Sequence, residues 1–147
     1  MHVQAMPRTC LAIAVTALAA ACTAPAPVAS TASATIDRSC GPADGPAFDL
    51  RVPTGAGILA LYAEGSPADA AGTYSVGRGD SPATYSIALC QPNADSCEQA
   101  QEASVALRRS GEGTYTGTFD AVFAQGGRVS TRFEAVPADP QSQMLCG

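Results

Sequence analysis

Apolar and polar residues alternate along much of the chain, and the clearest alternation covers residues 114–123. In this segment one face would carry Tyr115, Phe119, Ala121 and Phe123, and the other Thr114, Thr116, Thr118 and Asp120. Residues 128–135 repeat the pattern, with Val129, Thr131, Phe133 and Ala135 opposite Arg128, Ser130, Arg132 and Glu134. A period of two is typical of a strand with one buried face, and the glycines of the intervening Ala124–Gly127 suit a tight turn. The two segments therefore predict a β-hairpin.

Five other segments have the same strand-like character. They are residues 48–52, 58–62, 72–77, 84–89 and 105–107. The second of them, Ile58–Tyr62, is apolar throughout, which predicts a strand buried on both faces. Residues 96–104 have no apolar stripe, so we expect a loop or a single helical turn there. About seven short strands separated by turns predict an all-β fold, either a small antiparallel sandwich or a barrel.

The first 39 residues differ in composition from the rest of the chain. An apolar run of 11 residues, Leu11–Ala21, follows the positively charged Arg8, and Cys22 comes directly after the run. The run is too short to cross a bilayer as a helix, because that takes about 20 apolar residues. Residues 23–39 are mostly Ala, Pro, Ser and Thr, a composition that favours a flexible tether.

This amino-terminal layout resembles a bacterial lipoprotein signal peptide, whose cysteine becomes the acylated first residue of the mature protein. Ala20 and Ala21 match the small residues of that motif, whereas Leu18 stands one position earlier than the leucine that the motif prefers. The resemblance implies a signal peptide at 1–21, a lipidated Cys22 with a tether at 22–39, and a β domain at 40–147. An ordinary secretory peptide cleaved after Ala21 is the alternative.

The same resemblance implies a location in the cell envelope. Acyl chains such as palmitate would anchor the protein to a membrane through Cys22, and Thr23 after it favours the outer membrane, facing the periplasm. A soluble periplasmic or secreted protein is the alternative. The chain without residues 1–21 holds seven Arg, no Lys, no His and 13 acidic residues, a formal charge of −6. Such an acidic domain has no electrostatic reason to bind nucleic acid.

Four cysteines remain beyond Cys22, and an even number in a small exported domain predicts disulfides. Three pairings are possible. We favour a local bridge from Cys90 to Cys97 across the turn-rich Gln91–Ser96, with Cys40 joined to Cys146 at the two ends of the domain. A zinc site is the alternative, but six residues separate Cys90 from Cys97 and no His stands beside them, whereas zinc motifs use two to four.

The residues available for catalysis are few. Without His or Lys, the exported chain lacks the usual bases that activate Ser or Cys nucleophiles, so we predict no catalytic, metal or cofactor site. Candidate carboxylates alternate onto the polar faces of the predicted strands, as on a solvated sheet; they include Asp49, Asp120 and Glu134. The tripeptide Arg78–Asp80 reads Arg-Gly-Asp in a turn, and we interpret it as an ordinary turn sequence. The four tyrosines suit packing in the core or at its rim better than a ligand groove.

Residues 113–135, followed by a late cysteine, are similar to small β-rich bacterial lipoproteins of unknown role. We therefore expect a non-enzymatic envelope lipoprotein with a binding or structural role, one version being an inhibitor or immunity-type protein with a protein partner. Its first candidate contact surface is the loop Gln91–Ser96, because a disulfide would preorganise it. A glycan hydrolase that depends on two carboxylates is the alternative.

Overall fold

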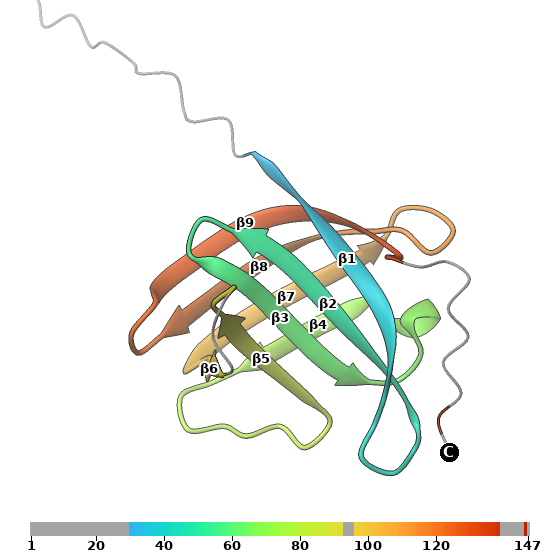
Figure 1. The fold of residues 1–147 in the computed structure, drawn as a ribbon, viewed down its shortest axis with the longest axis horizontal. Helices are drawn as coiled ribbons and strands as arrows, with labels where there is room; N and C mark the ends of the chain where they lie inside the picture. Colours follow the sequence, from blue (N-terminus) through green and yellow to red (C-terminus); the bar gives the residue numbers. More distant parts are fainter. Residues whose placement is uncertain (1–29, 93–95, 139–145, 147) are drawn as a thin grey trace, which may run out of the picture.

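The computed structural model describes residues 30–92, 96–138 and 146, and within these ranges the chain forms one strongly curled sheet of nine strands (Figure 1). The strands are β1 (Thr31–Cys40), β2 (Pro46–Thr54), β3 (Gly57–Glu64), β4 (Gly72–Val76), β5 (Tyr85–Cys90), β6 (Cys97–Gln99), β7 (Glu102–Arg109), β8 (Tyr115–Phe123) and β9 (Gly127–Val136). A 3-10 turn, η1 (Pro67–Asp69), joins β3 to β4. No helix in the described part of the chain is long and apolar enough to cross a membrane.

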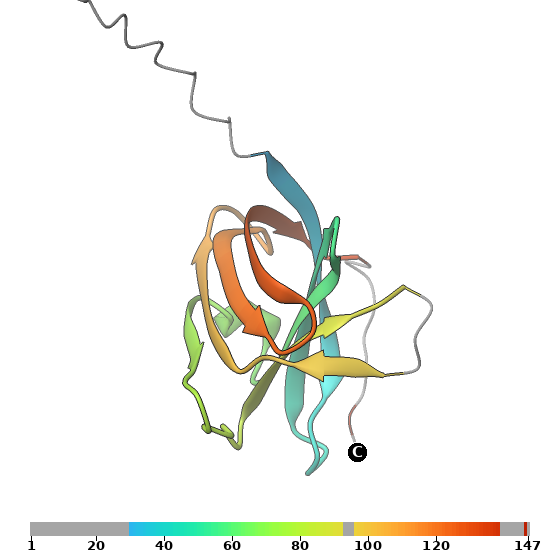
Figure 2. The ribbon, with the colours of Figure 1, turned by 90° about the vertical axis from the view of Figure 1, so that its left-hand side faces the viewer.

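The strands lie side by side in the order β4-β7-β8-β9-β1-β2-β3-β5-β6. All neighbours are antiparallel except β1 and β9, which are parallel. Figure 2 shows how the sheet wraps around its own inner face. The prediction of an all-β fold is confirmed, but the number of strands is nine rather than seven, and they form a single half-barrel sheet. The two strands that the pattern missed are β1 and β6.

The predicted boundary between tether and domain at Cys40 is wrong. Residues 31–39 belong to β1, which pairs with β9 through Thr31–Thr35 and with β2 through Thr35–Cys40. Ala34 and Ile36 of this strand are buried in the core. The small side chains that favoured a tether fit between two neighbouring strands, so pairing on both edges outweighs the weak apolar character of the segment.

The expectation of a loop or helical turn at 96–104 is also wrong. Cys97–Gln99 pairs with β5, and Glu102 already belongs to β7. No apolar stripe is visible in the sequence, because β6 is only three residues long and lies at the edge of the sheet. Disulfide bonding to the neighbouring strand holds it there in place of apolar burial.

The predicted hairpin of residues 114–123 and 128–135 is confirmed as β8 and β9. The turn closes at Phe123 opposite Gly127, whose φ of 67° is a conformation that suits glycine. The inner face of the pair carries the predicted apolar residues. Buried among them are Tyr115, Phe119, Ala121, Phe123, Phe133 and Ala135.

The inner faces of the other strands complete one continuous core around this hairpin. Its largest fully buried side chains from elsewhere in the chain are Phe48, Ile36, Leu50, Leu59, Leu61, Ile87, Val52 and Val105. Contrary to the expectation for Ile58–Tyr62, β3 buries only one face fully: Leu59 and Leu61 point inward, while Ile58, Ala60 and Tyr62 are half-buried on the outer face. The outer face of β3 is therefore apolar but accessible.

Side-chain contacts close the curl of the sheet at strands that no backbone ladder joins. The hydroxyl of Tyr85 on β5 donates to the carbonyl of Ser75 on β4 and accepts from its N–H at 3.3 Å. At the other end, the carboxylate of Glu98 on β6 accepts from the N–H groups of Gln125 and Gly126, at 2.7 and 3.2 Å. The first contact joins β5 to the edge strand β4, and the second joins the edge strand β6 to the β8–β9 turn.

Two tyrosines hold the η1 turn against the core. The hydroxyl of the fully buried Tyr115 donates to the carbonyl of Pro67, and that of Tyr74 donates to the carbonyl of Ala70 at 3.0 Å. Burial, followed by the neighbouring Tyr115, raises the pKa of Tyr74 above the ordinary value for tyrosine, so Tyr74 stays a hydrogen-bond donor across the neutral range.

We expect Tyr115→Phe to lower the free energy of unfolding by about 1–2 kcal/mol, because the Pro67 carbonyl would lose its partner. Urea denaturation of both proteins measures the difference. Tyr62→Phe is the matched control, since the Tyr62 hydroxyl bonds to the Cys40 carbonyl on the outer face, where water can replace it. An equal loss in both variants would contradict the role assigned to the buried hydroxyl.

Candidate binding surface

A groove of about 430 Å³ crosses the outer face of β2, β3, β5 and β6. The register of the sheet aligns its residues in rows: Arg51 lies opposite Ala60, which lies opposite Ala88, which in turn lies opposite Gln99. In the next row Asp49, Tyr62 and Ser86 are neighbours. The groove is thus built on consecutive strands of a rigid sheet, which fixes the positions of its side chains.

Small apolar side chains form the floor of this groove. Ile58, Ala60 and Ala88 all face outward, and Ala88 is only 6% exposed although it lies on the outer face. Two alanines side by side on adjacent strands leave a hollow where larger residues would fill the surface. An apolar floor inside a concave surface is what binding sites for ligands or partner side chains commonly have.

Polar side chains border the floor. Arg51 donates to the Asp49 carboxylate through two nitrogens, at 2.9 and 3.1 Å. The Tyr62 hydroxyl donates to the Cys40 carbonyl at 3.1 Å, and the Gln91 amide donates to the Ala56 carbonyl at 2.9 Å. These bonds hold the bordering side chains in defined positions, with remaining donors and acceptors available to a bound molecule.

The predicted contact loop adjoins the groove. Gln91, Pro92 and Cys97 line one end of it, whereas residues 93–95 of the loop lie outside the described residues. Cys90 and Cys97 are directly opposite each other on β5 and β6 and form a disulfide with a Cα–Cα distance of 4.2 Å. The described residues Gln91 and Pro92 of the loop are therefore part of the same surface as the groove.

The other disulfide joins Cys40 at the end of β1 to Cys146, with a Cα–Cα distance of 5.5 Å. The structure thus contains the two pairs that we favoured, and all four cysteines of the domain are bonded. Within the described ranges no group of three or more His, Cys, Asp or Glu side chains is placed to hold a metal ion. Cys22, the candidate lipidation site, lies outside the described residues.

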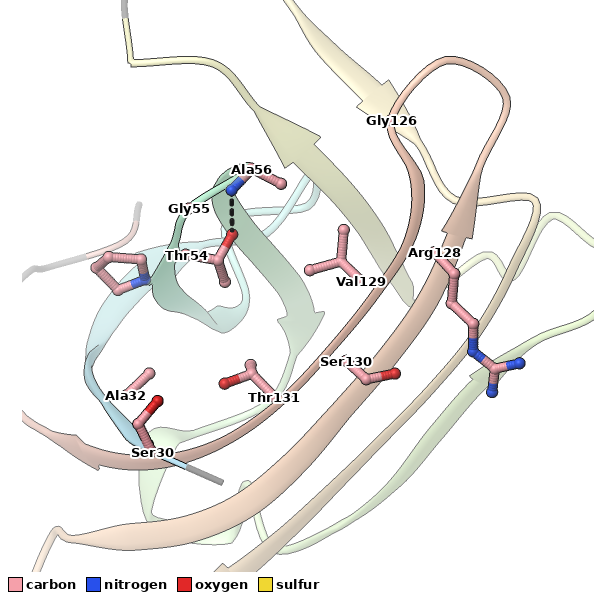
Figure 3. Close-up of a pocket in the computed structure, with 11 residues that line it drawn as sticks. Ser30, Ala32, Thr54, Gly55, Ala56, Gly126, Arg128, Val129, Ser130 and Thr131 are labelled. Atoms are coloured by element: carbon pink, nitrogen blue, oxygen red, sulfur yellow. Dashed lines mark hydrogen bonds between the residues drawn. The ribbon is translucent and has the colours of Figure 1, made fainter. Parts of the chain in front are cut away.

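A second hollow, of about 620 Å³, lies where β1 enters the sheet (Figure 3). Ser30 and Ala32 from the start of β1, Thr54–Ala56 from the turn between β2 and β3, and Ser130 and Thr131 from β9 surround it. The Thr54 hydroxyl accepts from the Ala56 N–H at 3.2 Å and so orders the turn. The side chain of Arg128 points away from the hollow (Figure 3) and pairs with Asp120 at 2.8 Å. Although larger, this hollow is more open to solvent than the groove and is lined by small polar and apolar residues without a continuous apolar floor, so we prefer the groove as a binding site.

The charged side chains of the Arg-Gly-Asp tripeptide bond to other residues of the domain. Arg78 forms an ion pair with Glu102 at 3.2 Å, and the Asp80 carboxylate accepts from the Gly77 N–H at 2.9 Å. Both charged groups therefore stabilise the turn after β4 and its contact with β7, in agreement with its interpretation as a turn sequence.

Of the tyrosines, Tyr74 and Tyr115 pack against or within the core. Tyr85 joins β5 to the edge strand β4, while Tyr62 borders the groove.

The candidate carboxylates lie on outer strand faces. Asp49 pairs with Arg51, Asp120 pairs with Arg128, and Glu134 is exposed. Hydrogen bonds from Arg128 lower the pKa of the Asp120 carboxyl below its ordinary value, although partial desolvation opposes them. A general acid in sugar hydrolysis needs a raised pKa, so the environment of Asp120 favours a permanently ionised surface group.

We expect the Asp120 carboxyl to titrate below the ordinary aspartate range, and to return toward that range in Arg128→Gln. A lowered pKa in the folded state stabilises the protein above the ordinary aspartate pKa, and this contribution is lost as the pH falls through the lowered value. The effect on stability is small because both side chains are largely exposed. NMR titration of the carboxyl carbon measures the midpoint; no difference between the two proteins would contradict the pairing.

Comparisons of the chain with models of known protein families, with curated protein sequences and with solved structures find no match.

Proposed function

We propose that this protein is a lipid-anchored binding protein of the bacterial cell envelope, without catalytic activity, whose outer-face groove receives a protein partner. The observation that carries the proposal is the groove itself. It combines an apolar floor at Ala60 and Ala88 with a polar border and a loop clamped by the Cys90–Cys97 disulfide. A preorganised surface of this kind loses little entropy on binding. An inhibitor or immunity-type protein is one version of this function.

Two disulfides in a small domain support a location outside the cytoplasm, where thiols are oxidised. The signal-like sequence that ends at Cys22 supports the same location and adds the lipid anchor. Metabolic labelling with a fatty-acid analogue tests the anchor. We expect incorporation into the wild type and none into Cys22→Ser; an unlabelled wild type that is released from the envelope without detergent would favour the soluble alternative.

The groove is tested by filling it. We expect Ala60→Gln to reduce recovery of a stoichiometric partner from detergent-solubilised envelopes at least tenfold, because the longer side chain occupies the floor. Ala106→Gln is the matched control: Ala106 is also half-buried and outward-facing, but it lies on β7, away from the groove. Circular dichroism confirms that both variants are folded. Equal recovery of the partner with both variants would refute the groove as the binding site.

The alternative function, a glycan hydrolase that uses two carboxylates, makes a different prediction. Wild-type protein would then turn over at least one substrate in a panel of envelope glycans, and replacing one of the two carboxylates by its amide would abolish the reaction. The ion pairs of Asp49 and Asp120 with neighbouring arginines favour the binding function over this one.

A further inference from the structure

The start of β1 defines one end of the domain, which we call the tether end. Ser30 lies there beside the β2–β3 turn (residues 54–56) and Gly126 of the β8–β9 turn, all around the same hollow. The opposite, or distal, end carries the loop 41–45 and η1. Figure 1 shows that β1 runs from the first of these ends to the loop at the second. The chain therefore enters the domain at one defined end.

From these positions we infer that the tether end, with the β2–β3 and β8–β9 turns, faces the lipid surface to which Cys22 is anchored. The inference rests on the proposed acylation of Cys22. Because β1 begins at Thr31 and not at Cys40, only residues 23–30 separate the anchor from the sheet. The nine Cα–Cα steps from Cys22 to Thr31 span at most roughly 30 Å, even if the segment is fully extended.

Because β1 is about as long as this maximum span, the limit determines which end of the domain can face the membrane. Its ten residues rise about 30 Å at roughly 3.3 Å per residue. If the distal end faced the membrane, the segment 22–30 would have to run back along the whole length of β1, which leaves it no slack. With the tether end facing the membrane, the same segment spans only the gap between the lipid and the sheet. The short connection thus favours one orientation strongly.

The absence of tryptophan from the chain allows a direct test with single-tryptophan variants of the full, acylated protein. Ala56→Trp places the probe in the β2–β3 turn and Ala43→Trp places it in the distal loop; both positions are exposed. Each variant is reconstituted into phosphatidylcholine–phosphatidylglycerol vesicles with or without brominated lipid, which quenches tryptophan fluorescence. We expect at least two-fold quenching for Ala56→Trp and none for Ala43→Trp.

Equal quenching at the two positions, or stronger quenching at Ala43→Trp, would overturn the inferred orientation and leave the lipid anchor intact. Failure of the protein to float with the vesicles would overturn the anchor, and with it this inference, so the two failures are distinguishable. Inserting an Ala-Pro repeat of twenty residues before Thr31 is the matched control. If tether length sets the orientation, this insertion reduces the quenching of Ala56→Trp toward that of Ala43→Trp.

Discussion

Removing the Cys40–Cys146 disulfide is expected to cost about 4–5 kcal/mol of folding free energy in a Cys40→Ala/Cys146→Ala double variant. The bond closes a loop with a sequence separation of 106 residues, and the entropy that a cross-link removes from the unfolded chain grows with the logarithm of loop length. Since small domains are stable by only about 5–15 kcal/mol, this variant should be close to unfolding at 37 °C. Urea denaturation of residues 22–147 with Cys22→Ser, with and without the double substitution, provides the measurement.

The Cys90→Ala/Cys97→Ala variant is the internal control for this prediction. Its loop has a sequence separation of only seven residues, for which the same model gives a loss of about 2.4 kcal/mol. If the two double variants lost equal stability, loop closure would not explain the contribution of the long-range bond.

Gly117→Ala is expected to destabilise the domain by about 3 kcal/mol, at the upper end of the usual cost of overpacking a core. Gly117 lies on the inner face of β8, opposite Phe133 on β9 and Leu107 on β7. A Cβ atom at this position would lie 2.1 Å from the Ala106 carbonyl oxygen and 2.7 Å from the Phe133 ring. The first of these neighbours is backbone, so the strands themselves would have to move apart.

Gly72→Ala provides the matched strand position on β4, because a Cβ atom there meets no other atom within 4 Å. Urea denaturation and near-ultraviolet circular dichroism of both variants separate a local packing change from a general intolerance of alanine in strands. Comparable losses in the two variants would mean that close packing of Phe133 over Gly117 is not the reason for the glycine.

Alternation predicted most of this fold because most strands bury one face and expose the other. The residues of β8 and β9 show this directly, from Tyr115 to Ala135. Alternation did not predict the strands whose structure depends on pairing with neighbouring strands. The Ala- and Ser-rich β1 is held by strands on both edges, and the three-residue β6 is held by a disulfide and by Glu98. Such interactions depend on which strands become neighbours, and no local pattern contains that information.

The sequence indicated part of the groove. The uninterrupted apolar run Ile58–Tyr62 indicated that the second face of its strand was not an ordinary solvated surface, but we interpreted it as full burial. The loop Gln91–Ser96, which we expected to be the first contact surface, adjoins the same region, since Gln91 and Pro92 line the groove. The sequence could not show that Ala60 and Ala88 would become neighbours on β3 and β5, because that depends on the register between two strands.

The parallel pairing of β1 with β9 has a consequence for how the protein reaches its folded state. Thr31 pairs with Arg132, so two of the central strands come from opposite ends of the domain sequence. Long-range contacts of this kind form slowly, because a long loop must close before they contribute. A chain that crosses a membrane amino terminus first cannot complete its sheet until β9 has emerged. For the exported protein that we propose, this topology would delay completion of the sheet until β9 has crossed the membrane, and the chain would remain extended until then.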